Sequence, residues 1–286
     1  LSKNCAEMVI LQHAGARAGS IFVPFNWRLA SAEIDALAAD AEPEIVFHDP
    51  EFAPPSAARR AMAVADMLSL GQEGAKPSPD ARRPFGDVAT FLYTSGTSGR
   101  PKGVMLSEEN AFWGCANFIY GNDVTMRSVF LCDMPLFHTA GLYAAARSPI
   151  QAGATLLISK GFDPVHTLER MTDPALGVTH YFSVPQMAAT LWNQPTFAPE
   201  KLKNIVSWAI GGAGLPCAQN GSPGCRAGRK SWLGGDEIFR CAAQDGVLPR
   251  IGSGCARQSI GGRGCGAVHT RHKTGPIGSA SGGAAC

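Results

Sequence analysis

The sequence predicts an α/β protein with a partial doubly wound, mostly parallel sheet, followed by a tail that we expect to be disordered. Through residue 216, short runs of β-branched and aromatic residues alternate with segments whose apolar residues recur at helical spacing, as in a parallel sheet joined by crossover helices. The mainly apolar run at 155–158 suits a strand covered on both faces. After residue 216 neither spacing continues for more than one turn.

Helical spacing predicts the helices. In the first, over residues 5–18, apolar residues recur three positions apart, which places them on one face of a helix. A second opens at Ser31 and carries Glu33 in its first turn, where the helix dipole favours an acidic side chain. The remaining expected helices span residues 58–70, 107–120, 142–151 and 165–171.

Runs of β-branched and aromatic residues predict the strands. They are expected at residues 21–24, 44–47, 88–93, 129–132, 154–159, 179–184 and 205–210. The stretch 50–83 is rich in Pro, Ala and Ser and has few large apolar residues outside 58–70. We expect its end, at residues 76–83, to form an exposed loop.

Composition and charge exclude several classes of function. The chain has 286 residues, of which 45% are hydrophobic, and a net charge of +2. The length suits one large domain or two small ones, and the charge is too small to indicate nucleic acid or an acidic membrane surface as a partner. The stretch 8–25 is broken by polar residues and falls short of a transmembrane segment. The first residue is Leu1, so we expect the original start to be missing; without a visible signal peptide, we expect a cytoplasmic protein.

The tail at 217–286 has a different composition. It holds 16 of the 33 glycines and 6 of the 9 cysteines, with only nine Leu, Ile, Val or Phe residues. Such a segment buries too little apolar surface to offset its chain entropy, and its Cys and His spacing is too wide for a zinc site. Two interpretations stay open: a native basic extension, or out-of-frame translation of a GC-rich gene, which the composition favours. The sequence therefore predicts a domain at 1–216 and a disordered or frameshifted tail at 217–286.

The segment YTSGTSGRPKGV, at residues 93–104, carries the strongest functional signal. It lies between an expected strand and an expected helix, so we expect a strand–loop–helix connection. Its glycines let the backbone approach a ligand closely, its hydroxyl groups can donate to phosphate oxygens, and Lys102 adds a positive charge. The candidate phosphate-binding residues are Thr94, Ser95, Gly96, Thr97, Ser98, Gly99, Lys102 and Gly103. A Walker loop would need Ser or Thr after the lysine, where this chain has Gly103.

The whole string resembles the Tyr-Thr-Ser-Gly-Thr-[Ser/Thr]-Gly-x-Pro-Lys-Gly loop of the AMP-forming acyl-CoA synthetase, or adenylate-forming, family. Four further motifs resemble the same family: the segment Asn26-Trp27-Arg28-Leu29, the stretch 135–142 that contains His138, the strand and turn with Tyr181, Phe182, Val184 and Pro185, and the turn Gly211-Gly212-Ala213. The resemblance covers essentially residues 1–216. It implies part of the large N-terminal AMP-binding domain of that family.

The resemblance also implies a two-step reaction with ATP, Mg²⁺ and coenzyme A as cofactors. ATP and a carboxylic acid form an acyl-adenylate and pyrophosphate, and a thiol, usually coenzyme A, then displaces AMP. Lys102 and His138 would be the catalytic residues: the loop at 94–103 would hold the pyrophosphate, and His138 would shape the acyl or thiol channel. The turn at 211–213 would line the adenine site. The implied protein is a ligase of fatty acid metabolism, and the residues leave the identity of the acid open.

The resemblance stops after the glycine turn. In the family a Tyr-Gly-x-Thr-Glu motif follows, but this chain has no Thr-Glu dipeptide and no tyrosine after Tyr181. The family's ribose-binding Asp and adenylation Lys also lack counterparts, so we expect an inactive fragment of an acyl- or aryl-CoA synthetase. Two alternatives stay open: a non-catalytic nucleotide-binding fragment, and a piece of an adenylation domain that feeds a carrier protein. Detection of an acyl-CoA product, or of an adjacent carrier domain in the gene, would separate them.

Overall fold

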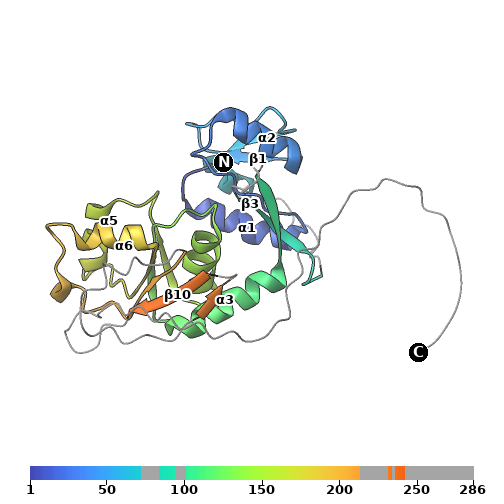
Figure 1. Cartoon of the computed structure of the whole chain (residues 1–286). Coiled ribbons are helices and arrows are strands. Elements are labelled where there is room, and N and C mark those ends of the chain that lie inside the picture. Colours follow the sequence, from blue (N-terminus) through green and yellow to red (C-terminus); the bar gives the residue numbers. More distant parts are fainter. Residues whose placement is uncertain (72–83, 95–100, 213–230, 234–235, 242–286) are drawn as a thin grey trace, which may run out of the picture. The chain divides into compact units, whose positions relative to one another are not determined.

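The computed structural model describes residues 1–71, 84–94, 101–212, 231–233 and 236–241, and the structural statements that follow concern these residues (Figure 1). The chain divides into two compact units, Leu1–Ser253 and Gly254–Cys286, and all described residues belong to the first. The expected loop at 76–83 lies outside the described residues. No helix in the described part is long and apolar enough to cross a membrane.

The main sheet has six strands in the order β6-β5-β7-β8-β10-β9. Neighbours among the first four are parallel, and β10 pairs antiparallel with β8 and β9. The strands are β5 (Val129–Cys132), β6 (Thr155–Ile158), β7 (His180–Ser183), β8 (Ser207–Ile210), β9 (Ser231–Leu233) and β10 (Asp236–Cys241). The prediction of an α/β fold with a mostly parallel sheet is confirmed.

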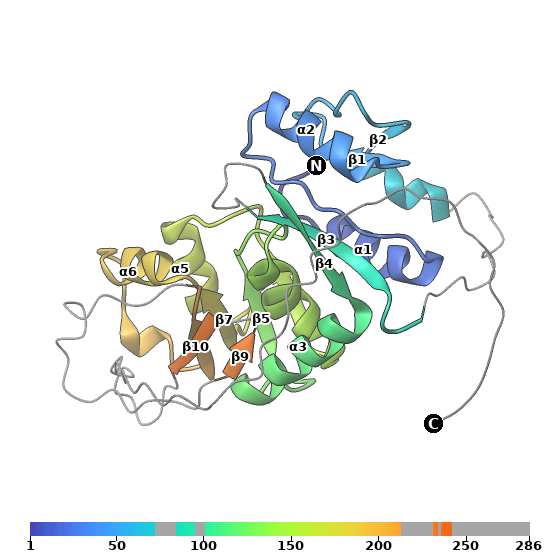
Figure 2. The ribbon, with the colours of Figure 1, turned by 45° about the vertical axis from the view of Figure 1, so that its right-hand side comes forward.

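Helices connect the parallel strands in the way that a doubly wound sheet requires. A π-helix, η2 (Ala140–Arg147), continues into α4 (Ser148–Gln151) between β5 and β6. Helix α5 (Pro164–Thr172) joins β6 to β7, and α6 (Pro185–Trp192) joins β7 to β8. Helices α5 and α6 lie together to one side of the sheet, away from η2 and α4 (Figure 2). The sequence analysis missed α6 and predicted a single helix where η2 and α4 follow each other.

Burial distinguishes central strands from the edge. All residues of β7 and β8 are buried, whereas β6 is only partly buried. The run at 155–158 was expected to be covered on both faces; Leu156, Leu157 and Ile158 pack against the core cluster but are only partly buried, and Thr155 is exposed. The incomplete burial is that of an edge strand, because β6 pairs with β5 alone among the described strands. The largest core cluster includes Phe118, Leu131, Tyr181 and Leu191 and holds the sheet to its helices.

In the N-terminal part, residues that include Phe25, Ile34 and Val46 form a separate small core, whereas Met8 and Val9 belong to the largest cluster. Helix α1 (Ala6–Ala18) and helix α2 (Ser31–Ala41) match the predicted helices. Strand β1 (Val46–His48) pairs in parallel with β2 (Ala61–Ala63), which leads into the 3₁₀ helix η1 (Val64–Gly71). The helix predicted at 58–70 is therefore present only from Val64, as a 3₁₀ helix, because residues 61–63 pair with β1 instead.

The predicted phosphate segment is built on an antiparallel hairpin of β3 (Val88–Thr94) and β4 (Lys102–Ser107). Helix α3 (Glu108–Asn122) follows immediately, with Ser107 as its N-cap. The expected direct passage from a connecting segment into the helix is thus corrected, because β4 stands before α3. The strand predicted at 21–24 is reduced to one parallel bridge, between Phe22 and Thr90 of β3.

The segment after residue 216 contains the strands β9 and β10, although the sequence analysis expected no regular element there. In this pairing, Phe239 of β10 lies opposite Ile210 of β8. The other residues of 217–286 lie outside the described residues, so the division at residue 216 stays a prediction.

The turn from β5 into η2 depends on a close backbone approach at Gly141. A Cβ atom on Gly141 would lie 2.0 Å from the carbonyl oxygen of Pro135 and 2.9 Å from that of Met134. Only glycine allows two backbone segments to approach so closely. Because both neighbours are backbone atoms, a side-chain rotation cannot relieve the clash.

We predict that Gly141→Ala lowers the free energy of unfolding by about 3 kcal/mol or more, because overpacking in a dense core forces backbone shifts. Urea denaturation would measure the change. Gly161→Ala is the matched control, since a Cβ there would meet no atom within 4 Å. Equal denaturation midpoints for the two variants would contradict the close approach.

Candidate functional site

Two predicted motifs meet at one edge of the main sheet. The stretch 133–138 follows the carboxyl end of β5, and Gly211 and Gly212 follow the carboxyl end of β8. Because β5, β7 and β8 are parallel neighbours, both motifs leave the sheet on the same side, with β7 between them. Ligands of open α/β sheets bind at this edge.

The β3–β4 hairpin places Thr94 and Lys102 at the last pair of its ladder, at the end where the two strands are joined. Thr94 and Lys102 lie opposite each other in the ladder, and both are exposed. Thr94 Oγ1 is 3.5 Å from the Lys102 carbonyl oxygen, and Lys102 forms no ion pair with the described residues. Its ammonium group is available to an anion. The predicted residues Ser95, Gly96, Thr97, Ser98 and Gly99 lie outside the described residues.

Tyr93 lies directly beside the pair of Thr94 and Lys102, opposite Gly103 in the ladder. A Cβ atom on Gly103 would lie 3.4 Å from the Tyr93 ring, so the ring covers the Gly103 backbone. The Tyr93 hydroxyl donates to Asp40 Oδ2 at 2.6 Å, which ties the hairpin to α2. Partial burial, and then the Asp40 carboxylate, raise the pKa of Tyr93. The hydroxyl therefore stays protonated and remains a donor.

His138 lies beyond the end of β5, on an exposed turn next to aromatic and cationic groups. Its ring centroid is 4.7 Å from that of Phe137. The guanidinium of Arg28 lies over the rings of both Trp27 and Phe137, at 5.0 and 5.7 Å from their centroids. Loss of water around the ring, and then the charge of Arg28, lower the pKa of His138 below its ordinary value. The neutral imidazole is thus favoured near pH 7.

Buried polar side chains fix the start of this segment. Asn4 is buried; its Nδ2 donates to the Met134 carbonyl at 2.8 Å, and its Oδ1 accepts from the Leu136 N–H at 2.9 Å. Asp133 Oδ2 accepts hydrogen bonds from Thr167 at 2.6 Å and from Tyr181 at 3.2 Å. These contacts connect the segment to the N-terminus, to α5 and to β7.

The glycine turn after β8 is shaped by its backbone. The Gly211 N–H donates to the Ser183 carbonyl at 3.1 Å, which extends the pairing of β7 and β8. Gly212 has a φ of 92°, and a Cβ there would lie 3.4 Å from Val184 Cγ1. Such a positive φ strains any residue with a side chain. Ala213, the last predicted residue of this turn, lies outside the described residues.

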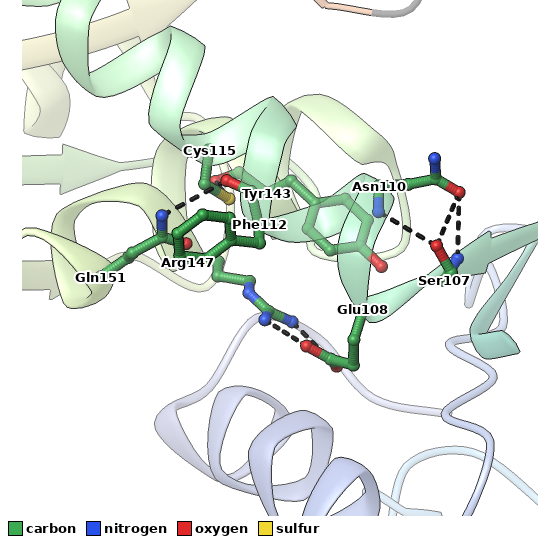
Figure 3. A network of polar contacts seen from close by, with 8 residues as sticks. All are labelled: Ser107, Glu108, Asn110, Phe112, Cys115, Tyr143, Arg147 and Gln151. Atoms are coloured by element: carbon green, nitrogen blue, oxygen red, sulfur yellow. Dashed lines mark hydrogen bonds and ion pairs between the residues drawn. The ribbon is translucent and has the colours of Figure 1, made fainter. Parts of the chain in front are cut away.

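A polar network links the hairpin to the helix that follows His138 (Figure 3). Arg147 of η2 forms a bidentate ion pair with Glu108, the first residue of α3, and both side chains are largely buried. Nearby, Cys115 Sγ donates to the Tyr143 carbonyl at 3.5 Å. In addition, a core cluster includes Leu92 of β3 and Leu142 of η2. The two predicted site segments are therefore held by one packed unit.

The described residues offer no ligand set for a metal ion, since no cluster of three His, Cys, Asp or Glu side chains occurs among them. The groups that can act on an anion are Lys102, with the hairpin around it, and the pair of Arg28 and His138.

Comparison with known proteins gives a consistent result. The model of the AMP-binding enzyme family matches residues 1–219. A feruloyl-CoA synthase of Amycolatopsis sp is 33% identical over 207 residues, which are 71% of this chain and 41% of the relative. An indoleacetate–CoA ligase of Aromatoleum aromaticum is 29% identical over 231 residues and is covered to 45%. The chain thus spans less than half the length of these relatives.

Solved structures are similar as well. ATP-bound MatB from Rhodopseudomonas palustris is 28% identical, with a TM-score of 0.64; the match covers 72% of this chain and 42% of that one. The o-succinylbenzoate CoA synthetase MenE from Bacillus subtilis, in complex with its acyl-adenylate intermediate, is 26% identical, with a TM-score of 0.66 and coverages of 77% and 56%.

We predict that Glu108→Gln lowers the free energy of unfolding by about 3–5 kcal/mol, because it leaves the Arg147 charge buried without its partner. Replacing both residues, as Glu108→Gln with Arg147→Met, should cost less than the single change. Chemical denaturation of the single and double variants measures the difference. Glu44→Gln is the control, since Glu44 pairs with Arg59 at 2.6 Å but both side chains are exposed, and such pairs contribute about 0–1 kcal/mol. An equal effect of both single changes would contradict the buried pair.

Proposed function

The chain belongs to the AMP-binding enzyme family, and on that premise we propose that it is part of a ligase that activates a carboxylic acid with ATP and transfers the acyl group to coenzyme A. The relatives that match it include CoA ligases for aromatic and fatty acids. A role in fatty acid metabolism and a cytoplasmic location belong to the same proposal.

The hairpin is the observation that carries the proposal. Lys102 is exposed and forms no ion pair with the described residues, and it stands opposite Thr94 at the mouth of the phosphate segment. A lysine ammonium and the Thr94 hydroxyl are donors suited to phosphate oxygens. We assign them to the phosphates of ATP and to the departing pyrophosphate. Bound there, ATP would supply the adenylyl group that activates the acid.

The other predicted residues would act around this position. His138, with its pKa lowered by desolvation and by Arg28, would present a neutral ring to the acyl or thiol channel. Gly211, Gly212 and Ala213 would line the adenine site, where a backbone without side chains leaves room for a flat base. These assignments rest on the family and on the common sheet edge.

We further propose that this chain binds nucleotide without completing the reaction. A missing sequence motif supports this proposal and also favours a second candidate, a non-catalytic nucleotide-binding module. The Thr-Glu dipeptide, which in the family holds phosphate and magnesium, is absent from the sequence. Precise orientation of the reacting groups supplies about 7–11 kcal/mol in enzymes. One lysine–phosphate contact contributes only about 1.5–3 kcal/mol, so the hairpin alone cannot restore turnover.

Lys102→Ala is predicted to weaken the binding of pyrophosphate and ATP about tenfold, because a charge-assisted hydrogen bond is lost. Isothermal titration calorimetry measures the affinity, and Lys201→Ala, in an exposed 3₁₀ turn, is the charge-matched control. Thermal melting should be unchanged in both variants, since neither lysine supports a core. Equal affinities would remove Lys102 from the site.

The same chain should show no acid-dependent exchange of labelled pyrophosphate into ATP. Robust exchange would refute the proposed inactivity and would favour the ligase over the non-catalytic module.

We also propose that the family domain ends near residue 216 and that residues 217–286 form a separate segment. The family match ends at residue 219, and the composition changes at the same place. Limited proteolysis with mass spectrometry should cut within 217–286 before it cuts the domain. A segment as resistant as the domain, protected through the β8–β10 pairing, would contradict this division.

A further inference from the structure

Among the side-chain hydrogen bonds at the candidate site, those of the buried Asn4 join residues that are farthest apart in the sequence. Asn4 reaches across to the segment after β5 and bonds the Met134 carbonyl and the Leu136 N–H, at 2.8 and 2.9 Å. Met134 and Leu136 are buried, at 4% and 0% exposure. Buried backbone groups outside helices and strands need partners. Asn4 supplies one donor and one acceptor from a single planar group.

Asn4 is itself held on both sides. Its neighbours Ser2 and Lys3 both donate to Asp49 Oδ2, the first through its hydroxyl and the second through its backbone N–H, each at 2.9 Å. On the other side α1 begins at Ala6. The carboxamide is thus fixed before it meets the segment, and little side-chain freedom is lost when the two hydrogen bonds form.

Other restraints on the segment from Asp133 to His138 are apolar packing, close contact with the Gly141 backbone and short-range hydrogen bonds. The His138 N–H donates to the Pro135 carbonyl at 3.1 Å, and the Leu142 N–H donates to the His138 carbonyl at 2.8 Å. These bonds are local and move with the segment. Asp133 holds its beginning through Thr167 and Tyr181. Between that point and His138, the Cys132 thiol also donates to the Met134 carbonyl at 3.7 Å, but Cys132 belongs to the preceding strand β5. Among the described side chains, Asn4 is the one that bonds this backbone from a distant part of the sequence.

We propose that Asn4 is a positioning residue: its carboxamide holds the backbone of residues 134–136 in the arrangement that places His138 beside Arg28 at the carboxyl edge of β5. This inference rests on the proposed function in one respect, the role of His138 in the acyl or thiol channel. The placement itself concerns this chain alone and can be measured without turnover.

The test uses the pKa of His138 as a measure of its position. Desolvation and Arg28 lower this pKa in the intact protein. Loosening the segment lets water reach the ring and separates it from Arg28. In Asn4→Ala, the pKa of His138, followed by NMR titration of the imidazole, should therefore rise toward about 6.5, the value of an unperturbed histidine.

A stability control and a milder variant complete the experiment. Ile205→Val removes one methyl group from the core, where Ile205 is buried, and should destabilise the protein without moving the pKa of His138. Asn4→Asp keeps the acceptor for the Leu136 N–H but loses the donor to Met134, so an intermediate rise is expected. In the unmodified chain, the Leu136 amide should exchange its hydrogen as slowly as the amides of the buried strand β7.

Three results would overturn the inference. They are an unchanged His138 pKa in Asn4→Ala, an equal rise in Ile205→Val, and rapid exchange of the Leu136 amide in the unmodified chain. Pyrophosphate binding distinguishes this failure from failure of the proposed function. If pyrophosphate binding depends on Lys102 but the His138 pKa is unchanged in Asn4→Ala, only the positioning role is rejected. If pyrophosphate binding is unchanged in Lys102→Ala, the proposed function is rejected.

Discussion

The close packing of the Gly141 backbone against the carbonyl groups of Met134 and Pro135 is the constraint on which the candidate site depends. It lets η2 turn back directly over the segment that leaves β5, so that His138 stays at the sheet edge. The same turn sets the direction of η2, which brings Leu142 to Leu92 of the hairpin and Arg147 to Glu108. A π-helix in this place is consistent with the use of such helices at functional sites.

The two halves of the site are held by different kinds of interaction. The segment with His138 is fixed by buried hydrogen bonds from Asn4 and Asp133, whose loss would leave polar groups without partners in the core. The β3–β4 hairpin is anchored through Leu92 in a core cluster and through the bridge from Thr90 to Phe22, while Thr94 and Lys102 at its end are exposed. A buried, well-bonded segment beside an exposed lysine suits a reaction in which a charged group must enter and leave the site. An exposed ammonium group stays hydrated, so it can release a bound anion easily.

The sequence predicted what local spacing determines and missed what distant partners determine. Strand β5 was predicted at its observed bounds, since its side chains are apolar throughout. Strand β4 was missed because Gly103 and the preceding Pro101 are typical of a loop, and only pairing with β3 makes this stretch extended. In the segment 58–70, predicted as a helix, residues 61–63 form strand β2 instead, because β1 offers a parallel partner. Nothing near Asn4 indicates that its partners lie about 130 positions away.

The requirements of folding and of binding can be separated in this protein by burial. Gly141 and Asn4 are buried and the pair of Glu108 and Arg147 is largely buried, so any loss of binding after their replacement includes a loss of structure. Lys102 is exposed and supports no core, so its replacement reports on ligand chemistry alone. His138 lies between these cases, because the residue is exposed overall while its ring is partly desolvated and the preceding residues Leu136 and Phe137 are buried. The pKa of His138 therefore reports whether the buried residues hold the segment in its native position, independently of whether a ligand binds at Lys102.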